Sequence, residues 1–414
     1  FAALAAGLSV PFLWAAARTL LAPRFATLAP ALFALSFLNI YIQVAANAEV
    51  FMLLPLTAGL WAFALGARSG SLPAFLAAGV LTSLAVFTRQ SALWTLIGYG
   101  AWLAVLFLRY REERPHLLRA VAALTAGALL AAIPFVVYFA AHDALSELWY
   151  AMFEFNWFRA GESSFYMKLI PPIIGNPVPL VGGLVFWALA ALGVWRLCLR
   201  GDRFAWLILS FLVSSEAAAQ MMGRLFPHYS VQLLPGAALA GALGLLYVWE
   251  RWQEGRRLPA AFVVATAGVT VGAAAFLYSQ PTAADRFEVQ YWYRDNAQDA
   301  IFAPEIAAAV EMMTQPGDYV YELGKESEIY FLADRQPASR WLHNRPYKVD
   351  KSILDEVIGD LEEKRPAVIL LTFEESELED GAYRPPAKLA AYLDDNYRYA
   401  GRVIYADLFQ RVER

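Results

Sequence analysis

Side chains able to take part in group transfer stand at the ends of long apolar segments of this sequence. Seven of them fall at three junctions, namely Asn47 and Glu49, Arg89 and Gln90, and Arg224, His228 and Tyr229. Arginine binds phosphate oxygens through paired hydrogen bonds, histidine exchanges a proton near neutral pH, and glutamate acts as a base or binds a metal ion. The set therefore suits a reaction that forms a bond to a sugar while a phosphate is held.

Each of these residues also has a structural explanation. Glu49 stands in the first turn of an expected helix, where the helix dipole favours an acid. Arg89 can reach the membrane interface as an anchor, and His228 and Tyr229 can be ordinary interfacial residues. Glu216 lies inside an apolar segment, so it must be neutralised, paired or in contact with a wet cavity, or else it is a hydrogen-bonded packing residue. The sequence alone leaves these alternatives open.

The composition indicates an integral membrane protein. Of the 414 residues, 59% are hydrophobic and 17% are charged, whereas soluble domains have about 45–50% and about 25%. These values exclude an ordinary soluble enzyme and a disordered protein, and the net charge of -4 provides no basic field for nucleic acid. The single cysteine, Cys198, excludes an intramolecular disulfide framework and a zinc site built on several thiolates.

Ten segments are apolar enough to cross a bilayer as helices of about 20 residues. They cover residues 1–17, 25–46, 50–67, 69–88, 90–108, 120–141, 178–195, 204–223, 229–249 and 258–278. One set of alternating loops carries thirteen arginines and the other carries four Arg or Lys residues, so the positive-inside rule places the first set in the cytoplasm. The start of the chain and everything after about residue 280 are then expected outside. Because the chain starts at Phe1 within an apolar run, we also expect it to lack its true N-terminus.

We expect a multi-span membrane domain over residues 1–284 and an extracytoplasmic α/β domain over residues 285–414. Within the first, the outer loop 142–177 is rich in aromatic and acidic residues, which predicts an amphipathic helix on the outer leaflet. The second has soluble composition, and its strand and helix patterns alternate. Its expected helices cover 291–315, 351–363 and 386–396, and its expected strands cover 319–323 and 368–371, with a closing hairpin at 403–409.

Several short motifs follow one another along the chain in an order that is typical of one enzyme family. They are NAEVF at 47–51, GVLTSL at 79–84, TRQS at 88–91, GR at 223–224, PHY at 227–229, QLLP at 232–235, PGDYVY at 316–321 and EIYFLADR at 328–335. Together they resemble the polytopic C-type (GT-C) glycosyltransferases of family 39, of the protein mannosyltransferase and aminoarabinose transferase kind. The resemblance covers nearly the whole chain.

The resemblance implies transfer of a single sugar from a polyprenyl-phosphate-linked donor to a lipid, glycan or protein acceptor on the outer side of the membrane. Glu49 then corresponds to the second outer acidic site of the family, whose main catalytic aspartate is expected in a missing N-terminal loop. The expected lipid-phosphate subsite consists of Arg89, Gln90, Arg224, His228 and Tyr229. Glu216 and Asn47 are expected to form an intramembrane polar site. The resemblance requires no cofactor and leaves a divalent metal open, and the Ala/Leu/Arg-rich composition favours a bacterial inner membrane.

Two other functions compete with the transferase. A transporter or lipid flippase would use an intramembrane carboxylate such as Glu216 in a proton relay, but we find no repeat between the two halves of the membrane segments of the kind that transporters commonly show. A membrane scaffold would use the outside domain to bind a partner. Only the transferase consumes a polyprenyl-phosphate sugar and releases polyprenyl phosphate.

Overall fold

The computed structural model describes most of the chain, which divides into two compact units, Phe1–Gln280 and Pro281–Arg414. The described residues are 1–36, 48–157, 183–220, 227–255, 294–324, 326–342, 352–372 and 386–412. The predicted outer loop is thus described only to residue 157, where it is helical from Leu145 onward, and the predicted span 258–278 lies outside the described residues.

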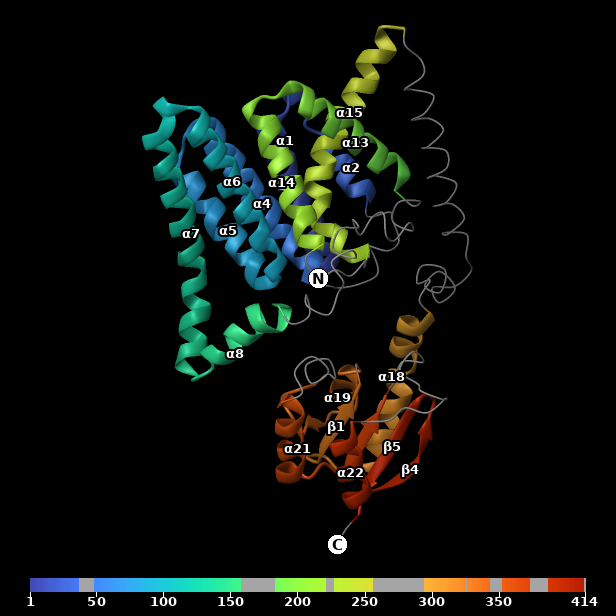
Figure 1. The fold of residues 1–414 in the computed structure, drawn as a ribbon. Coiled ribbons are helices and arrows are strands. Elements are labelled where there is room, and N and C mark those ends of the chain that lie inside the picture. Colours follow the sequence, from blue (N-terminus) through green and yellow to red (C-terminus); the bar gives the residue numbers. More distant parts are fainter. Residues whose placement is uncertain are drawn as a thin grey trace. The chain divides into compact units, whose positions relative to one another are not determined.

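The first unit is a bundle of apolar helices (Figure 1). The α-helices are α1 (Ala2–Leu20), α2 (Leu28–Ser36), α4 (Ala48–Ser69), α5 (Leu72–Thr88), α6 (Leu93–Arg109), α7 (Arg114–Ala141), α8 (Leu145–Trp149), α13 (Leu184–Arg200), α14 (Arg203–Gln220) and α15 (Leu234–Gln253). Short 3-10 helices lie between them, namely η1 (Pro23–Phe25), η2 (Gln90–Ala92), η3 (Arg111–Glu113) and η5 (Pro227–Leu233), and a π-helical turn, η4 (Tyr150–Glu154), continues α8.

The helices confirm the predicted membrane protein. Among the described residues, five helical stretches are long and apolar enough to cross a bilayer, and the apolar helix α5 is shorter. The five stretches are Ala2–Leu20, Ala48–Ser69, Gln90–Arg109, Arg111–Ala141 and Tyr229–Gln253. The count of ten spans stays a prediction.

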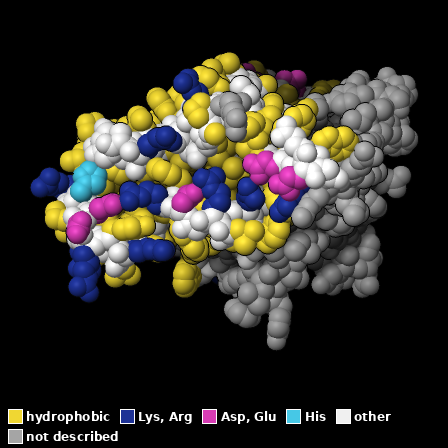
Figure 2. All heavy atoms as spheres, turned by 90° about the horizontal axis from the view of Figure 1, so that it is seen from above, with side chains coloured by type: hydrophobic (Ala, Val, Ile, Leu, Met, Phe, Trp, Pro, Cys, Tyr) yellow, Lys and Arg dark blue, Asp and Glu magenta, His cyan; other side chains and the backbone are white. Residues whose placement is uncertain are grey.

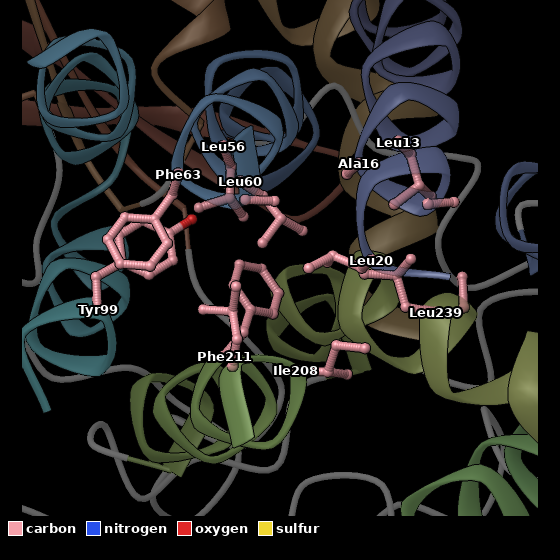
Figure 3. Packing of buried hydrophobic residues seen from close by; sticks show 14 of the residues in the cluster. Leu13, Ala16, Leu20, Leu56, Leu60, Phe63, Tyr99, Ile208, Phe211 and Leu239 are labelled. Carbon is pink, nitrogen blue, oxygen red and sulfur yellow. The ribbon is translucent and has the colours of Figure 1, made fainter. Parts of the chain in front are cut away.

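Glycines bring pairs of helices into backbone contact. A Cβ atom on Gly79 of α5 would lie 2.0 Å from the carbonyl oxygen of Leu124 in α7, and one on Gly127 would lie 2.0 Å from that of Leu76. Small residues allow such close packing of membrane helices. Aromatic stacking also joins helices, because the rings of Phe63 (α4) and Tyr99 (α6) stack with centroids 3.9 Å apart in the buried core (Figure 3).

Basic side chains gather at one end of the helical unit. Figure 2 shows this end, with Lys and Arg side chains spread over it among a few acids. Arg68 at the end of α4 donates a hydrogen bond to the carbonyl oxygen of Thr19, and Arg203 at the start of α14 pairs with Glu113 at 2.8 Å. These loops are among those that the charge distribution assigns to the cytoplasm, and that orientation stays a prediction.

The second unit is a small mixed sheet with helices. Its strands are β1 (Tyr319–Leu323), β2 (Gln336–Pro337), β3 (Val368–Leu371), β4 (Tyr397–Val403) and β5 (Ala406–Arg411), in the order β2-β1-β3-β5-β4. β1 is parallel to β2 and β3, whereas β5 is antiparallel to β3 and β4. The helices are α18 (Arg294–Met313), α19 (Glu328–Leu332), α21 (Ser352–Lys364) and α22 (Ala387–Asn396).

The predicted α/β fold of this unit is confirmed. The buried runs at β1 and β3 form its central parallel pair, with Val320 opposite Val368 and Leu323 opposite Leu371. The expected closing hairpin is longer than predicted, because β4 starts at Tyr397. The short helix α19 and the two-residue strand β2 are not predicted from the sequence, since elements of this length have too few residues to show a periodic pattern.

Candidate functional site

An ion pair between the start of α4 and the end of α5 forms the centre of the candidate site. Glu49 lies in the first turn of α4, and its Oε1 atom is 2.7 Å from Nη1 of Arg89, which follows α5. The Arg89 and Glu49 side chains are only 16% and 6% exposed. On another side, the guanidinium carbon of Arg89 lies 4.5 Å from the ring centroid of Tyr229 in η5, within the range of a cation–π contact.

The backbone around Arg89 explains why this side chain can reach its partners. Helix α5 ends at Thr88, and Arg89 adopts an extended conformation while its N–H still donates to the carbonyl oxygen of Ala85. The chain then makes the single 3-10 turn η2 and enters α6. The tight turn that the sequence predicts at Arg89 is therefore present.

A buried hydrogen-bond network joins this turn to η5. The hydroxyl of Ser91 donates to Oε1 of Gln232 over 2.9 Å. The Nε2 atom of Gln232 in turn donates to the carbonyl oxygen of Ser91 and to the hydroxyl of Thr95, both over 3.3 Å. Gln232 and Thr95 are buried. Both ends of the Gln232 amide thus bind the segment that carries Arg89.

A large cavity adjoins the ion pair. Its volume is about 1240 Å³, and its walls come from α5, η2, α6, α7 and the helical segment from α8 to Trp157, together with Ala48, Arg89, Ala218 and Tyr229. Most of the lining is apolar, including Phe87, Leu129 and Trp149, and Arg89 is its one cation among the described residues. Gln90, also in the lining, donates to the sulfur of Met152 over 3.7 Å. The cavity can take an apolar chain that ends in an anionic group.

The structure brings some of the predicted residues together and not others. Glu49, Arg89, Gln90 and Tyr229 meet at or beside the cavity. Glu216 instead accepts a hydrogen bond of 2.7 Å from Gln220 of its own helix, and it does not line this cavity. Asn47 and Arg224 lie outside the described residues, as does the side chain of His228.

Two polar residues next to the site are not among those predicted from the sequence. Ser91 and Gln232 stand within the short motifs TRQS and QLLP, but their pairing joins residues 141 positions apart. Spacing along η5 offers the one available signal, because residues three apart in a 3-10 helix share a face, which places Gln232 with Tyr229. Within the described ranges, no three His, Cys, Asp or Glu side chains gather closely enough to hold a metal ion.

The second unit also buries a carboxylate. Glu322 of β1 is fully buried and accepts a hydrogen bond from the hydroxyl of Thr372, just after β3. Burial raises the pKa of Glu322 to about 8, a shift that the Thr372 hydrogen bond reduces and the charge of Glu326 increases. Near neutral pH this side chain is therefore mainly a neutral acid.

Comparison with solved structures identifies the fold. ArnT from Cupriavidus metallidurans bound to undecaprenyl phosphate superimposes with a TM-score of 0.59 at 14% identity, over 99% of this chain and 83% of that one. The chain shares the GT-C fold. ArnT in the apo state gives a TM-score of 0.56 at 12% identity, again over 99% and 83% of the two chains.

A more distant likeness exists to the Archaeoglobus fulgidus oligosaccharyltransferase tethered with an acceptor peptide, with a TM-score of 0.48 and 13% identity. It covers 89% of this chain, which spans 57% of the length of that enzyme. No protein-family model and no curated protein matches the sequence. The GT-C fold is thus established by structure, and the activity is a matter for proposal.

Proposed function

We propose that this protein is a membrane glycosyltransferase that moves a single sugar from a polyprenyl-phosphate-linked donor to an acceptor on the extracytoplasmic side. The observation that carries the proposal is the buried Arg89–Glu49 pair beside an apolar cavity of about 1240 Å³. Cavities for drug-sized ligands measure about 300–1,000 Å³, so this one has room for part of an isoprenoid chain.

Arg89 provides the phosphate-binding group in this proposal. A guanidinium binds phosphate oxygens in a bidentate manner, and the ring of Tyr229 contacts the guanidinium of Arg89 from one side. The isoprenoid occupies the apolar walls between α5, α6, α7 and the α8–η4 helix. The complex of ArnT with undecaprenyl phosphate, on the same fold, supports this choice of ligand.

Glu49 provides a base. Its carboxylate takes the proton of the acceptor hydroxyl, and the hydroxyl oxygen then bonds to the anomeric carbon with inversion. The bond from that carbon to the phosphate oxygen breaks, and the phosphate leaves with the electron pair. Arg89 stabilises the negative charge that develops on the leaving group. Because the donor is already activated, the reaction needs no nucleotide.

The other predicted features belong to the same proposal. Arg224 and His228 join Arg89, Gln90 and Tyr229 at the lipid phosphate. The second unit lies on the extracytoplasmic side, where it helps to select the lipid, glycan or protein acceptor, and the membrane is a bacterial inner membrane.

The test follows the fate of the donor. The purified protein in nanodiscs is given undecaprenyl phosphate linked to mannose, glucose or aminoarabinose, with bacterial envelope lipids and glycans as acceptors, and mass spectrometry measures the undecaprenyl phosphate released. The proposal expects release that depends on an acceptor and is lost in Glu49→Gln. Movement of the lipid across a proteoliposome membrane with no consumption of any donor would instead support the transporter alternative.

A further inference from the structure

We propose that Gln232 is a positioning residue, which sets Arg89 in place for the lipid phosphate by joining η5 to the turn that carries this arginine. This inference rests on the proposed function. Gln232 itself is buried and does not line the cavity, so its effect on the ligand must pass through other residues.

Both ends of the Gln232 side-chain amide have hydrogen-bond partners. Its Oε1 atom accepts from the Ser91 hydroxyl, and its Nε2 atom donates to the Ser91 carbonyl and the Thr95 hydroxyl. A buried amide whose two ends have partners holds those partners in one arrangement, because breaking the network leaves buried polar groups without hydrogen bonds. The Ser91 backbone is therefore fixed, and Ser91 is only two residues from Arg89.

The contacts between η5 and the segment that carries Arg89 and Ser91 are in register. With three residues per turn in a 3-10 helix, Tyr229 and Gln232 project from the same face of η5. On the opposite segment, Arg89 contacts Tyr229 and Ser91 contacts Gln232. The two contacts thus lie next to each other and join η5 to the turn that carries Arg89. If the Gln232 hydrogen bonds are lost, Arg89 and Tyr229 can shift relative to each other.

Phosphate binding by Arg89 depends on how its guanidinium is oriented. Its guanidinium is already held by Glu49 at 2.7 Å and by the Tyr229 ring. A bidentate contact with phosphate depends on the plane of the guanidinium, and small displacements of a positioned group are costly to a binding site. We therefore expect Gln232 to affect phosphate affinity more than its distance from the cavity suggests.

The test measures equilibrium binding of undecaprenyl phosphate to the purified protein. Gln232→Met keeps the side-chain volume and removes the hydrogen bonds. It is expected to weaken binding about tenfold, within the range of coupling between contacting residues. The double variant with Arg89→Ala is expected to bind no more weakly than Arg89→Ala alone, because Gln232 acts through that arginine.

Two further variants keep the test decisive. Ser91→Ala removes one of the hydrogen bonds and is expected to weaken binding by a smaller factor, which serves if Gln232→Met does not fold. Ser210→Ala removes another hydrogen bond to α6, from Ser210 of α14 to the Gly98 carbonyl, and neither residue lines the cavity; this variant is expected to leave binding unchanged.

Three outcomes would overturn the inference. Unchanged affinity in Gln232→Met, or a further loss when it is added to Arg89→Ala, would show that Gln232 is only structural. A wild-type protein that does not bind undecaprenyl phosphate would remove the proposed function itself, and the role of Gln232 with it.

Discussion

Two clusters of the helical unit contain the same three residue types, an arginine between a glutamate and a tyrosine. Arg89 pairs with Glu49 and faces Tyr229, and Arg203 pairs with Glu113 at 2.8 Å and lies 5.2 Å from the centroid of the Tyr110 ring. They stand at opposite ends of α6, because Arg89 precedes this helix and Tyr110 follows it. Residue type alone does not distinguish a site from an ordinary surface cluster here.

Burial and the neighbouring cavity do distinguish the two clusters. The Arg203 and Glu113 side chains are 35% and 36% exposed, against 16% and 6% for Arg89 and Glu49. An exposed ion pair gains little, whereas a buried pair keeps two desolvated charges that depend on each other. Arg89 also lines the cavity, and Arg203 does not. A functional arginine in such a fold is therefore recognised by what it adjoins.

The largest expected difference between the clusters is catalytic. Glu49→Gln removes the proposed base and is expected to lower sugar transfer at least about 100-fold, the low end of general-base effects, while the protein stays folded. Glu113→Gln, the matched change, is expected to leave transfer unchanged. The rate of undecaprenyl phosphate release measures both. Full activity in Glu49→Gln would contradict the role of this carboxylate.

The next difference is in stability. Arg89→Ala leaves Glu49 buried without its cation and is expected to cost about 3–5 kcal/mol, whereas Arg203→Ala breaks an exposed pair and is expected to cost about 0–1 kcal/mol. The double variant Arg89→Met with Glu49→Gln should recover much of the loss, since it buries no charge. Unfolding of the purified protein by denaturant gives these values. Equal losses for the two arginine variants would refute the contrast.

Glu322 in the second unit provides a third carboxylate to compare with Glu49 and Glu113. It is buried, and its described contacts include no arginine. Its pKa of about 8 in the fold lies above the ordinary value of 4.5, so the native state holds a proton that the unfolded chain releases. The stability gained from this proton is complete below about pH 4.5 and is lost as the pH rises through about 8.

Glu322→Gln is therefore expected to make the stability of the sheet less dependent on pH between about 4.5 and 8. Hydrogen exchange of the β1 and β3 amides, corrected for its intrinsic pH dependence, should show that protection falls as the pH rises from about 4.5 to about 8 in the wild type and falls less in the variant. The same pH dependence in both proteins would mean that Glu322 does not carry the proton.

The smallest expected effect is that of Thr372→Val, which removes the hydrogen bond to Glu322 and nearly keeps the volume. It is expected to cost about 1–3 kcal/mol, the usual cost of a buried polar group left without its partner. The variant should also raise the pKa of Glu322 further, because that hydrogen bond lowers it. A denaturant titration of the second unit's signal provides the measurement, and an unchanged midpoint would contradict the assignment.

The sequence was sufficient for the parts of the fold that follow from local patterns. Apolar length predicts helices such as α4 and α7, and the buried run from Val368 to Leu371 predicts β3, because both depend on burial along one segment. The polar and charged residues at the ends of apolar segments also predict Glu49, Arg89, Gln90 and Tyr229 as a group. Their ion pair, however, joins different helices, and only packing determines it.

Other features have no local signal. The contacts between η5 and the turn that carries Arg89 depend on two short helices that pack together although the bonded residues are 141 positions apart in the sequence. The cavity arises from the way that α7 and the α8–η4 helix pack beside α5 and α6. For Glu216 the sequence leaves two explanations, and the structure shows that its carboxylate accepts a hydrogen bond from Gln220, one turn along the same helix; the polar site with Asn47 stays a prediction.

The most direct test of the central claim is the affinity of the purified protein for undecaprenyl phosphate in the wild type, in Arg89→Ala and in Arg203→Ala. Native mass spectrometry of the protein in nanodiscs with added lipid gives the three affinities side by side. We expect the wild type and Arg203→Ala to bind the lipid equally, and Arg89→Ala to lose most of its binding. Equal binding by all three proteins, or none by the wild type, would contradict a lipid-phosphate site at Arg89.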